Sequence, residues 1–410
     1  MKLKAFKYWA MIALISSNVS LFAQNKSNKT HKSEDKDARS INIDVPDIDI
    51  DIPDIDVRID LKDLEKMNIA LADLDLKLDN LGDNLAETLK DISFDININD
   101  NQDLNFNSVE KTKTFSRSYT VNRDDKLAID NQFGTIVINT WAKNEIKVDV
   151  TMKATEGSEN EAAKLLEGIN INETKSNNLI SLRTSIKQEK NNWGFRSGKD
   201  KRGIQINYTI YMPAGNPLDI TNKFGGTVIS DFNGVINVNS SYGSFSGKRL
   251  TNPANRIKVS YGSASIEQLK AGKIDVAYGS LDIENAERLS ADIKYSSSKI
   301  GRLSGSGDFN IKYAGGFKID EIDENLKDLN IDGAYSSMSL GFDPKSNFNF
   351  DVTVNYASFG YDSDKVNISS KTPDEHARGF NPSKNYKGTF GKGSDTKVVI
   401  QSNYGSVKFN

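Results

Sequence analysis

The side chains that most often carry catalysis or bind transition metals are almost absent from this chain. It contains no cysteine, and its only histidines are His31 and His376. Without cysteine there is no thiol nucleophile, no thiolate zinc or iron–sulfur site and no disulfide scaffold. Two isolated histidines do not supply a serine-type triad or a multi-histidine metal site. The chemistry open to this chain is therefore that of carboxylates, lysines, hydroxyls and aromatic rings.

Carboxylates and lysines recur in the C-terminal half without forming a recognisable catalytic set. Asp275, Asp282, Asp292 and Lys294 take outward positions, as they would on any solvated strand face. Nothing marks an acid and a base as a pair of the kind that glycosidases use. The GSGD turn at 305–308 lacks the rest of a phosphate-binding loop. We therefore expect no enzymatic activity, and the alternative is a carbohydrate-active enzyme on a β-helix.

Aspartates are densest in residues 41–60, where a heptapeptide occurs twice, as VPDIDID and as IPDIDVR. Carboxylate oxygens suit calcium, so this strip contains weak calcium candidates, and no other cofactor is expected. The EF-hand loop and the nonapeptide calcium repeat are both absent. Regularly spaced aspartates also serve simply to keep an exposed strip solvated. The calcium candidates are Asp47, Asp49, Asp51, Asp54 and Asp56.

A basic loop between two predicted strands is the best candidate for an exposed contact site. It spans residues 190–203 and places Trp193 among glycine and cationic residues. The alternative is a solvated loop that one aromatic side chain anchors to the body of the protein. Nucleic acid is not expected as a partner, because the exported chain is slightly acidic. The contact candidates are Trp193, Phe195, Arg196, Lys199, Lys201 and Arg202.

The net charge of −3 conceals an acidic arm and a basic remainder. Residues 41–100 contain 15 Asp and 2 Glu against 5 Lys and Arg, which gives this arm a charge of −12. Near-neutrality is therefore a cancellation between two unlike segments. Docking of the acidic arm on the cationic loop or on a strand face is one hypothesis, and exposed ion pairs alone would make such docking weak and salt-sensitive.

Leucine spacing predicts an amphipathic helix over residues 61–93. Leu64, Leu71, Leu78 and Leu85 recur every seven residues, a spacing typical of a coiled coil. A helix with such a stripe must bury it against another surface. Self-association through these leucines, packing on the main domain and binding to a membrane surface all remain open.

The first 23 residues have the pattern of a signal peptide. Three lysines precede an apolar run from Ala10 to Val19, and Leu21-Phe22-Ala23 precedes an expected cleavage before Gln24. No cysteine follows to carry a lipid anchor, and no later stretch reaches about 18 apolar residues, so no transmembrane span is expected after cleavage. We expect export to the periplasm or cell surface of a Gram-negative-type bacterium. Residues 24–60 are expected to form a disordered or extended acidic leader.

From residue 216 onward the chain repeats one sequence motif. In this motif a stretch of alternating apolar and polar residues is followed by an aromatic residue and then by two small residues. The alternation then resumes in the opposite phase, as around Tyr261-Gly262-Ser263. Alternation predicts half-buried strands, and the Gly or Ser permits a bend. The aromatic residue recurs at steps of 17–22 residues between Phe224 and Tyr356. This period predicts an all-β fold, namely a β-solenoid (β-helix) of about 17–22 residues per coil. The period does not fix the handedness of the coil, for which we expect right-handed winding.

The aromatic residues of the repeat share the phase of the inward Ile and Val residues. We therefore expect them to stack in the core, and the alternative is a surface stripe that stacks on sugars. Residues 110–215 are less regular, with strands at 179–186 and 204–212 and a short helix after a capping box formed by Ser158 and Glu161. Within the regular solenoid at 216–410, a polar insertion interrupts the last coils at 369–396, and we expect the C-terminal strand to cap it.

The segment NQFGTIVINTW at residues 131–141 resembles the putative-adhesin β-helix family of bacterial cell-envelope proteins. The strand IQINYTIYMP at 204–213 and the later Tyr-Gly-Ser coils agree with this resemblance, which covers roughly residues 110–410. It implies a β-helical surface or periplasmic module with an adhesive role. We therefore expect an exported, non-enzymatic, adhesin-like binding or structural module that contacts a surface glycan or an envelope protein. A sensing or scaffold protein partnered through the acidic arm is a further alternative.

Overall fold

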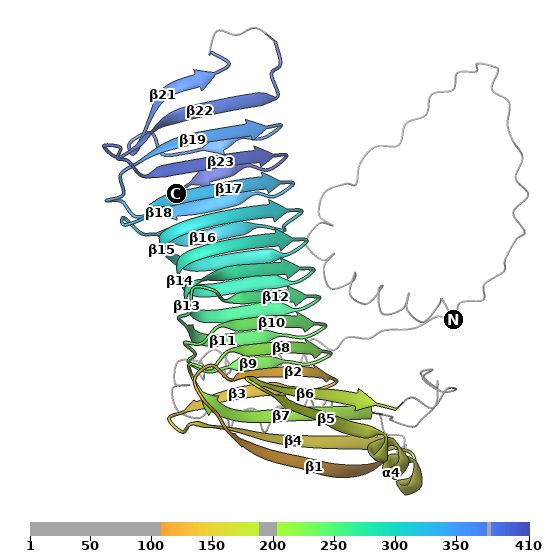
Figure 1. Cartoon of the computed structure of the whole chain (residues 1–410). Coiled ribbons are helices and arrows are strands. Elements are labelled where there is room, and N and C mark those ends of the chain that lie inside the picture. Colours follow the sequence, from red (N-terminus) through yellow and green to blue (C-terminus); the bar gives the residue numbers. More distant parts are fainter. Residues whose placement is uncertain (1–107, 188–202, 375–378) are drawn as a thin grey trace, which may run out of the picture. The chain divides into compact units, whose positions relative to one another are not determined.

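The described part of the protein is all-β, as predicted. The computed structural model describes residues 108–187, 203–374 and 379–410, which form 24 strands and one helix (Figure 1). The predicted signal peptide, acidic leader and heptad helix lie outside the described residues. Within the described ranges, no helix has the length and apolar character needed to cross a membrane.

An antiparallel group of strands and the helix α4 form the N-terminal part. Its elements are β1 (Val109–Thr120), β4 (Glu145–Glu156), α4 (Glu159–Glu167), β5 (Ile169–Ser176), β6 (Leu179–Ile186) and β7 (Gly203–Pro213). β4 lies between β1 and β7, and every second side chain of β4 is buried. β5 and β6 pair as a hairpin. The hydroxyl of Ser158 accepts a hydrogen bond from the Glu161 N–H at the start of α4, which confirms the predicted capping box.

Parallel strands then follow one another in two ladders. The first ladder runs β6, β2 (Lys126–Gln132), β8 (Leu218–Lys223), β10 (Ile236–Ser241), β12 (Arg256–Ser260), β13 (Ser263–Ala277), β14 (Ser280–Lys294), β15 (Ser297–Lys312), β17 (Asp328–Ala334), β23 (Lys397–Asn403) and β19 (Phe348–Asn355). The second runs β7, β3 (Ile136–Trp141), β9 (Thr227–Ile229), β11 (Phe245–Leu250), β13, β14, β15, β16 (Phe317–Ile322), β18 (Met338–Phe342), β24 (Val407–Phe409) and β20 (Phe359–Gly360).

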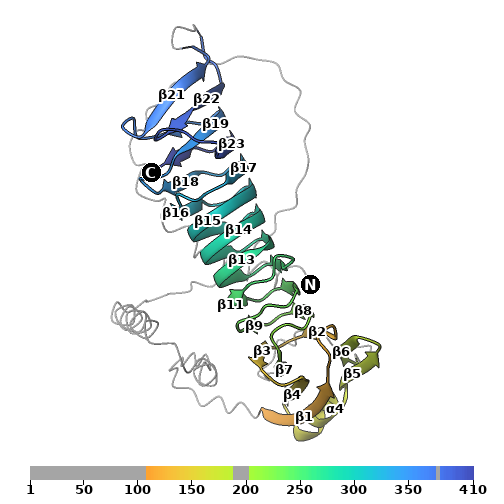
Figure 2. The same cartoon turned by 60° about the vertical axis from the view of Figure 1, so that its left-hand side comes forward.

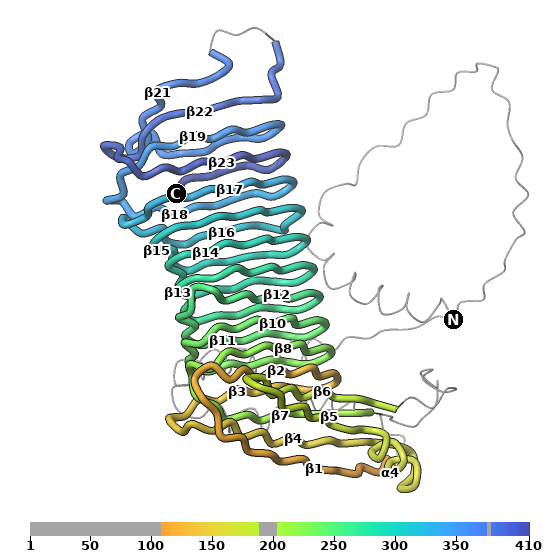
Figure 3. The backbone as a smooth tube through the Cα atoms, viewed as in Figure 1, coloured from red at the N-terminus to blue at the C-terminus, as the bar shows by residue number. Residues whose placement is uncertain are grey.

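The long strands β13, β14 and β15 belong to both ladders. The first part of β13 pairs with β11, whereas its last five residues pair with β12. The strands follow one another in the same order in two views (Figures 1 and 2), and the chain turns back repeatedly at one common edge (Figure 3). Residues one repeat apart in the sequence therefore become neighbours in space.

Apolar side chains in register build the core between the strands. One row on the first ladder contains Val238, Ile257, Ile274, Ala291 and Phe309, and all five are buried. Burial of a large apolar side chain contributes roughly 1.5–3 kcal/mol to the stability of the fold, and each strand adds one apolar side chain to each row. The alternation predicted from the sequence thus places the Ile and Val residues inward.

The C-terminal strands do not cap the ladders, so that prediction is wrong. β23 lies between β17 and β19, and β24 lies between β18 and β20. The predicted polar insertion instead contributes to two strands, β21 (Val366–Thr372) and β22 (Ser383–Phe390). β22 pairs antiparallel with one edge of β19, and β21 continues outward from β22. Because β22 occupies that edge of β19, the returning chain pairs with the other edge, beside β17.

Candidate functional site

The aromatic residue of each repeat sits at a corner with a left-handed backbone. Its φ lies between 50° and 63° at ten such positions from Phe133 to Tyr404. An L-residue rarely adopts this conformation, which reverses the direction of the chain and breaks the alternation of the preceding strand. Val259 is therefore buried, whereas Tyr261, two residues later, is 50% exposed. The prediction that these rings form a core ladder is wrong, because it extended the alternation of the strand through this corner.

A glycine follows six of the ten aromatic residues and permits close approach of neighbouring corners. The other four are followed by Ser296, Ala314, Ser336 and Ala357. A Cβ atom on Gly279 would lie 1.7 Å from the carbonyl oxygen of Gly262, and one on Gly262 would lie 1.9 Å from that of Gly243. The sequence predicted that Gly or Ser permits the bend itself. The positive φ instead falls on the aromatic residue, and the glycine leaves room for the backbone of the preceding corner.

The ten corner rings form one continuous stack, which we call the aromatic ladder. Successive ring centroids are 4.8–5.2 Å apart, and the ring planes differ by only 2–12°. Apart from the half-buried Phe133, each ring is 48–56% exposed. In spatial order the ladder comprises Phe133, Phe224, Tyr242, Tyr261, Tyr278, Tyr295, Tyr313, Tyr335, Tyr404 and Tyr356.

The ladder presents ring edges and tyrosine hydroxyls rather than ring faces. Parallel rings at this spacing cover each other's faces, as in other offset stacks. The alternative that placed these residues in a surface stripe is therefore correct about their position. Its assumption of sugar stacking on ring faces does not fit rings whose faces are covered by their neighbours.

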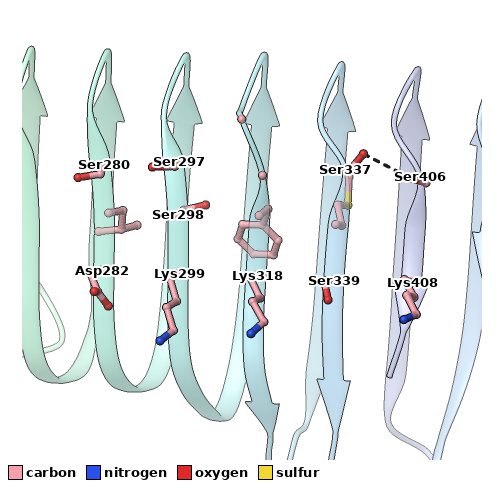
Figure 4. A pocket seen from close by; sticks show the side chains of 15 residues that line it. Ser280, Asp282, Ser297, Ser298, Lys299, Lys318, Ser337, Ser339, Ser406 and Lys408 are labelled. Carbon is pink, nitrogen blue, oxygen red and sulfur yellow. Dashed lines mark hydrogen bonds between the residues drawn. The ribbon is translucent and has the colours of Figure 1, made fainter. Parts of the chain in front are cut away.

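A shallow, open groove of about 620 Å³ crosses β14, β15, β16, β18 and β24, a few residues after the ladder corners in the chain (Figure 4). Ser280, Ser297, Ser337 and Ser406 line it, each two residues after a ladder tyrosine. The hydroxyls of Ser337 and Ser406 are 3.3 Å apart, within hydrogen-bonding distance. The groove therefore presents a row of hydroxyls whose residues closely follow the ladder tyrosines in the chain.

Lysines form a second row along the same groove, which we call the lysine row. Lys299 is in register with Lys318, and Ser339 separates Lys318 from Lys408 (Figure 4). Lys299 and Lys318 both form ion pairs with Asp320, and the Lys299 Nζ lies 3.3 Å from its carboxylate. The hydrogen bond from Lys318, with a smaller contribution from Lys299, lowers the pKa of Asp320. Among the described residues, Lys408 has no ion-pair partner.

Two carboxylates meet on the outer face of the first ladder, where the sequence marked no acid–base pair. Asp275 and Asp292 are in register on β13 and β14. Burial, followed by a hydrogen bond to Asp292, raises the pKa of Asp275. Burial also acts to raise the pKa of Asp292, but hydrogen bonds from Lys273, Asn310 and Asp275 outweigh it and lower that pKa. Lys273 Nζ is 3.0 Å from Asp292, and Asn310 Nδ2 is 2.9 Å from it.

This carboxylate pair fits a structural role better than a catalytic one. The acid and base of a glycosidase stand about 5 Å or more apart, with the reacting bond between them. Here the two side chains are neighbours in register, and Lys273 and Asn310 hold Asp292. In the described ranges, no cluster of three or more His, Cys, Asp or Glu side chains could hold a metal ion.

The site residues proposed from the sequence lie outside the described residues. These are the calcium candidates at 47–56, the self-association leucines at 64–85 and the contact candidates at 193–202, which all stay predictions. Sequence reasoning missed the lysine row. Its signal was present, because Lys299, Lys318 and Lys408 each follow a ladder tyrosine by four or five residues.

No family model matches this chain, and no curated protein does. Similar solved structures include a putative adhesin from Bacteroides fragilis, with 13% identity over 73% of this chain and 97% of that one, at a TM-score of 0.30. A putative cell adhesion protein from Clostridium sporogenes has 10% identity, coverage of 73% and 99%, and a TM-score of 0.20. A putative lipid binding protein from Parabacteroides distasonis has 11% identity, coverage of 72% and 96%, and a TM-score of 0.30.

Proposed function

We propose that this chain is an exported, non-enzymatic, adhesin-like module of the bacterial cell envelope that binds an extended ligand along its aromatic ladder. The observation that carries the proposal is the continuous stack of ten aromatic rings, nine of them about half exposed. A contiguous exposed aromatic surface on a folded protein is a frequent sign of an interaction site. Export rests on the signal-peptide pattern of residues 1–23.

The architecture we propose for this module is a β-solenoid. The parallel pairing of strands one repeat apart supports it, as do the three strands that belong to both ladders. In a solenoid each coil contacts only its neighbours, so side chains at one corner form an uninterrupted row. An extended, repetitive surface of this kind suits a long partner better than a small molecule.

Fold stability alone gives an incomplete reason for the aromatic residues at these corners. A left-handed backbone costs a non-glycine residue roughly 1–2 kcal/mol, a cost that glycine avoids. Each stacked ring pair contributes about 0.5–1.5 kcal/mol, which offsets the strain without clearly exceeding it. A role in binding would account for keeping tyrosine where a smaller residue fits the backbone better.

The exposed ring edges favour a ligand that makes hydrogen bonds and edge contacts along a line. Ladder tyrosines recur at successive strand steps, and the groove serines follow them by two residues in the chain. A surface glycan offers matching hydroxyl groups along its chain, whereas a ligand that must stack between rings finds their faces covered. We therefore place the glycan ahead of an envelope protein as the partner.

Substitution of three central ladder residues tests this function. Asparagine tolerates a positive φ, so changing Tyr278, Tyr295 and Tyr313 together to Asn should remove the rings and keep the corners. We expect this variant to lose at least about tenfold in affinity for the polysaccharides that bind best in a panel. The matched triple change to Phe keeps the stack, as Phe133 and Phe224 show, and removes only the hydroxyls.

The same panel distinguishes binding from catalysis. Saturable binding without product release is the expected result. New reducing ends or unsaturated products would show a carbohydrate-active enzyme instead. A folded Asn variant that binds every polysaccharide as tightly as the wild type would rule out the ladder as the binding surface. Protease treatment of intact cells then tests whether the module is reachable from outside.

A further inference from the structure

The lysine row places positive charges on neighbouring strands of the second ladder. Lys299 and Lys318 are directly in register, an arrangement that is unfavourable for like charges. A single carboxylate, Asp320, compensates both of them, and no described carboxylate pairs with Lys408. Asp282 is in register with Lys299 at one end of the row. The groove therefore keeps an excess of positive charge that an anionic ligand would relieve.

Hydroxyl groups separate this charge from the aromatic ladder. Ser280, Ser297, Ser337 and Ser406 lie between the lysine row and the ladder in the chain order of each strand. Both rows run across the strands, in the same direction as the stack of rings (Figure 4). A linear ligand lying in the groove would therefore meet cationic and hydroxyl groups together along its length.

The side chains of the groove favour a sugar polymer over other anionic polymers. Single-stranded nucleic acid binds largely by stacking its bases on aromatic faces, and the faces of these rings are covered. A peptide that added as a strand would need an unpaired edge, whereas β14, β15, β16, β18 and β24 are each paired on both sides within the second ladder. Lysine acts as a compact point charge that suits carboxylate or sulfate groups spaced along a chain.

We propose that the ligand is an acidic polysaccharide, bound in the groove with its anionic groups on Lys299, Lys318 and Lys408 and its hydroxyls on the serine row. This inference rests on the proposed function, and it adds the charge class of the ligand and the residues that select it. Attraction between exposed charges is screened by salt, so binding weakens as ionic strength rises.

The test uses the full chain with polygalacturonate as the acidic probe and a neutral galactan as its uncharged counterpart. The variant K299Q/K318Q/K408Q removes the lysine row. The control K248Q/K270Q/K327Q removes the same charge from three lysines farther along the chain from the ladder corners, none of which lines the groove. We expect polygalacturonate to bind the wild type in preference to galactan. The groove variant should lose about tenfold in affinity, since each exposed charge contact is modest, while the control should stay within about twofold.

Several outcomes separate this inference from the proposed function. One outcome would overturn the inference and leave the proposed function standing. In that outcome galactan and polygalacturonate bind equally well, the groove variant binds both like the wild type, and the triple Tyr-to-Asn variant loses binding. Failure of both polysaccharides to bind, with no effect of the tyrosines, overturns both. Tighter binding of single-stranded DNA than of polygalacturonate also overturns the inference. The salt dependence of polygalacturonate binding is measured on the wild type, so this test remains available if the groove variant fails to fold. Binding of polygalacturonate that does not weaken with salt would overturn the inference.

Discussion

Six of the ten corners in the aromatic ladder divide two tasks between an aromatic residue and the glycine that follows it. The aromatic residue takes the positive φ that reverses the chain, and at six corners the glycine after it leaves space for the preceding corner. These tasks differ physically, because the first strains one residue and the second limits the size of a side chain, so that only Gly, Ser or Ala follows the aromatic residue. Tyrosine at a strained position and glycine at an ordinary φ reverse the usual assignment of these residue types.

Two glycines in this part of the chain allow the crowding to be tested. Gly279→Ala would force a Cβ atom to within 1.7 Å of the Gly262 carbonyl oxygen, so the corner must shift. We expect a loss of roughly 3 kcal/mol or more in the free energy of unfolding, at the upper end of overpacking effects. The control is Gly315→Ala, because no atom lies within 4 Å of its added Cβ. Equal thermal unfolding curves for the two variants would refute the crowding argument.

At the scale of strands and helices, the sequence predicted position better than orientation. The strand at 179–186 and the helix after Ser158 follow from alternation and from a capping box, which are local signals. The outward turn of Tyr261 and its equivalents does not follow, because alternation says nothing about a residue that leaves the strand conformation. The order of the last strands also does not follow from the sequence, because the sequence does not indicate which edge of β19 pairs with β22 and which with β23.

Register between two strands brings Asp275 and Asp292 together, and this contact predicts opposite effects of two substitutions. The raised pKa of Asp275 means that the fold disfavours its charged form, a penalty that is present at neutral pH. This penalty disappears as the pH falls through the folded-state pKa. Asp275→Asn should therefore raise the melting temperature slightly at pH 7, and the gain should shrink toward pH 4.

Asp292→Asn should lower the melting temperature at neutral pH, because the lowered pKa of Asp292 shows that the fold favours its charge. That contribution exists above the unfolded-state pKa and is lost as the pH falls. Thermal unfolding of both variants between pH 4 and pH 7 checks the pair. A stabilised Asp292→Asn, or a destabilised Asp275→Asn at pH 7, would contradict the opposite directions of these two pKa shifts.

At the scale of the whole described fold, parallel ladders tie each strand to its immediate neighbours. Stability in such an arrangement is close to a sum of local strand contacts, so damage at one level spreads little. The strands β23 and β24 are an exception, because their neighbours in the ladders are not their neighbours in the sequence. They pair with strands formed by residues about 50 or more positions earlier. Their removal should therefore affect the fold at one defined level.

Deletion of residues 397–410 tests this expectation. It removes the buried side chains of Val398, Ile400, Val407 and Phe409, each worth roughly 1.5–3 kcal/mol. Hydrogen exchange should show that β19 and β22 lose protection, while β8, β10 and β12 keep theirs. Val399→Ala serves as a mild control, because this exposed residue lies in β23 but outside the core. Uniform loss of protection throughout the ladders would show that they unfold as a single unit.

The position of β23 and β24 also sets an order of events during synthesis. Residues 397–410 leave the ribosome after residues 348–390, yet they occupy the place between that segment and β17. The earlier levels can assemble as the chain emerges, but β19 must keep one edge open until the last strand arrives. An unpaired strand edge invites pairing with other chains. Export in an unfolded state, followed by folding of the complete chain, would shorten the period during which this edge stays open.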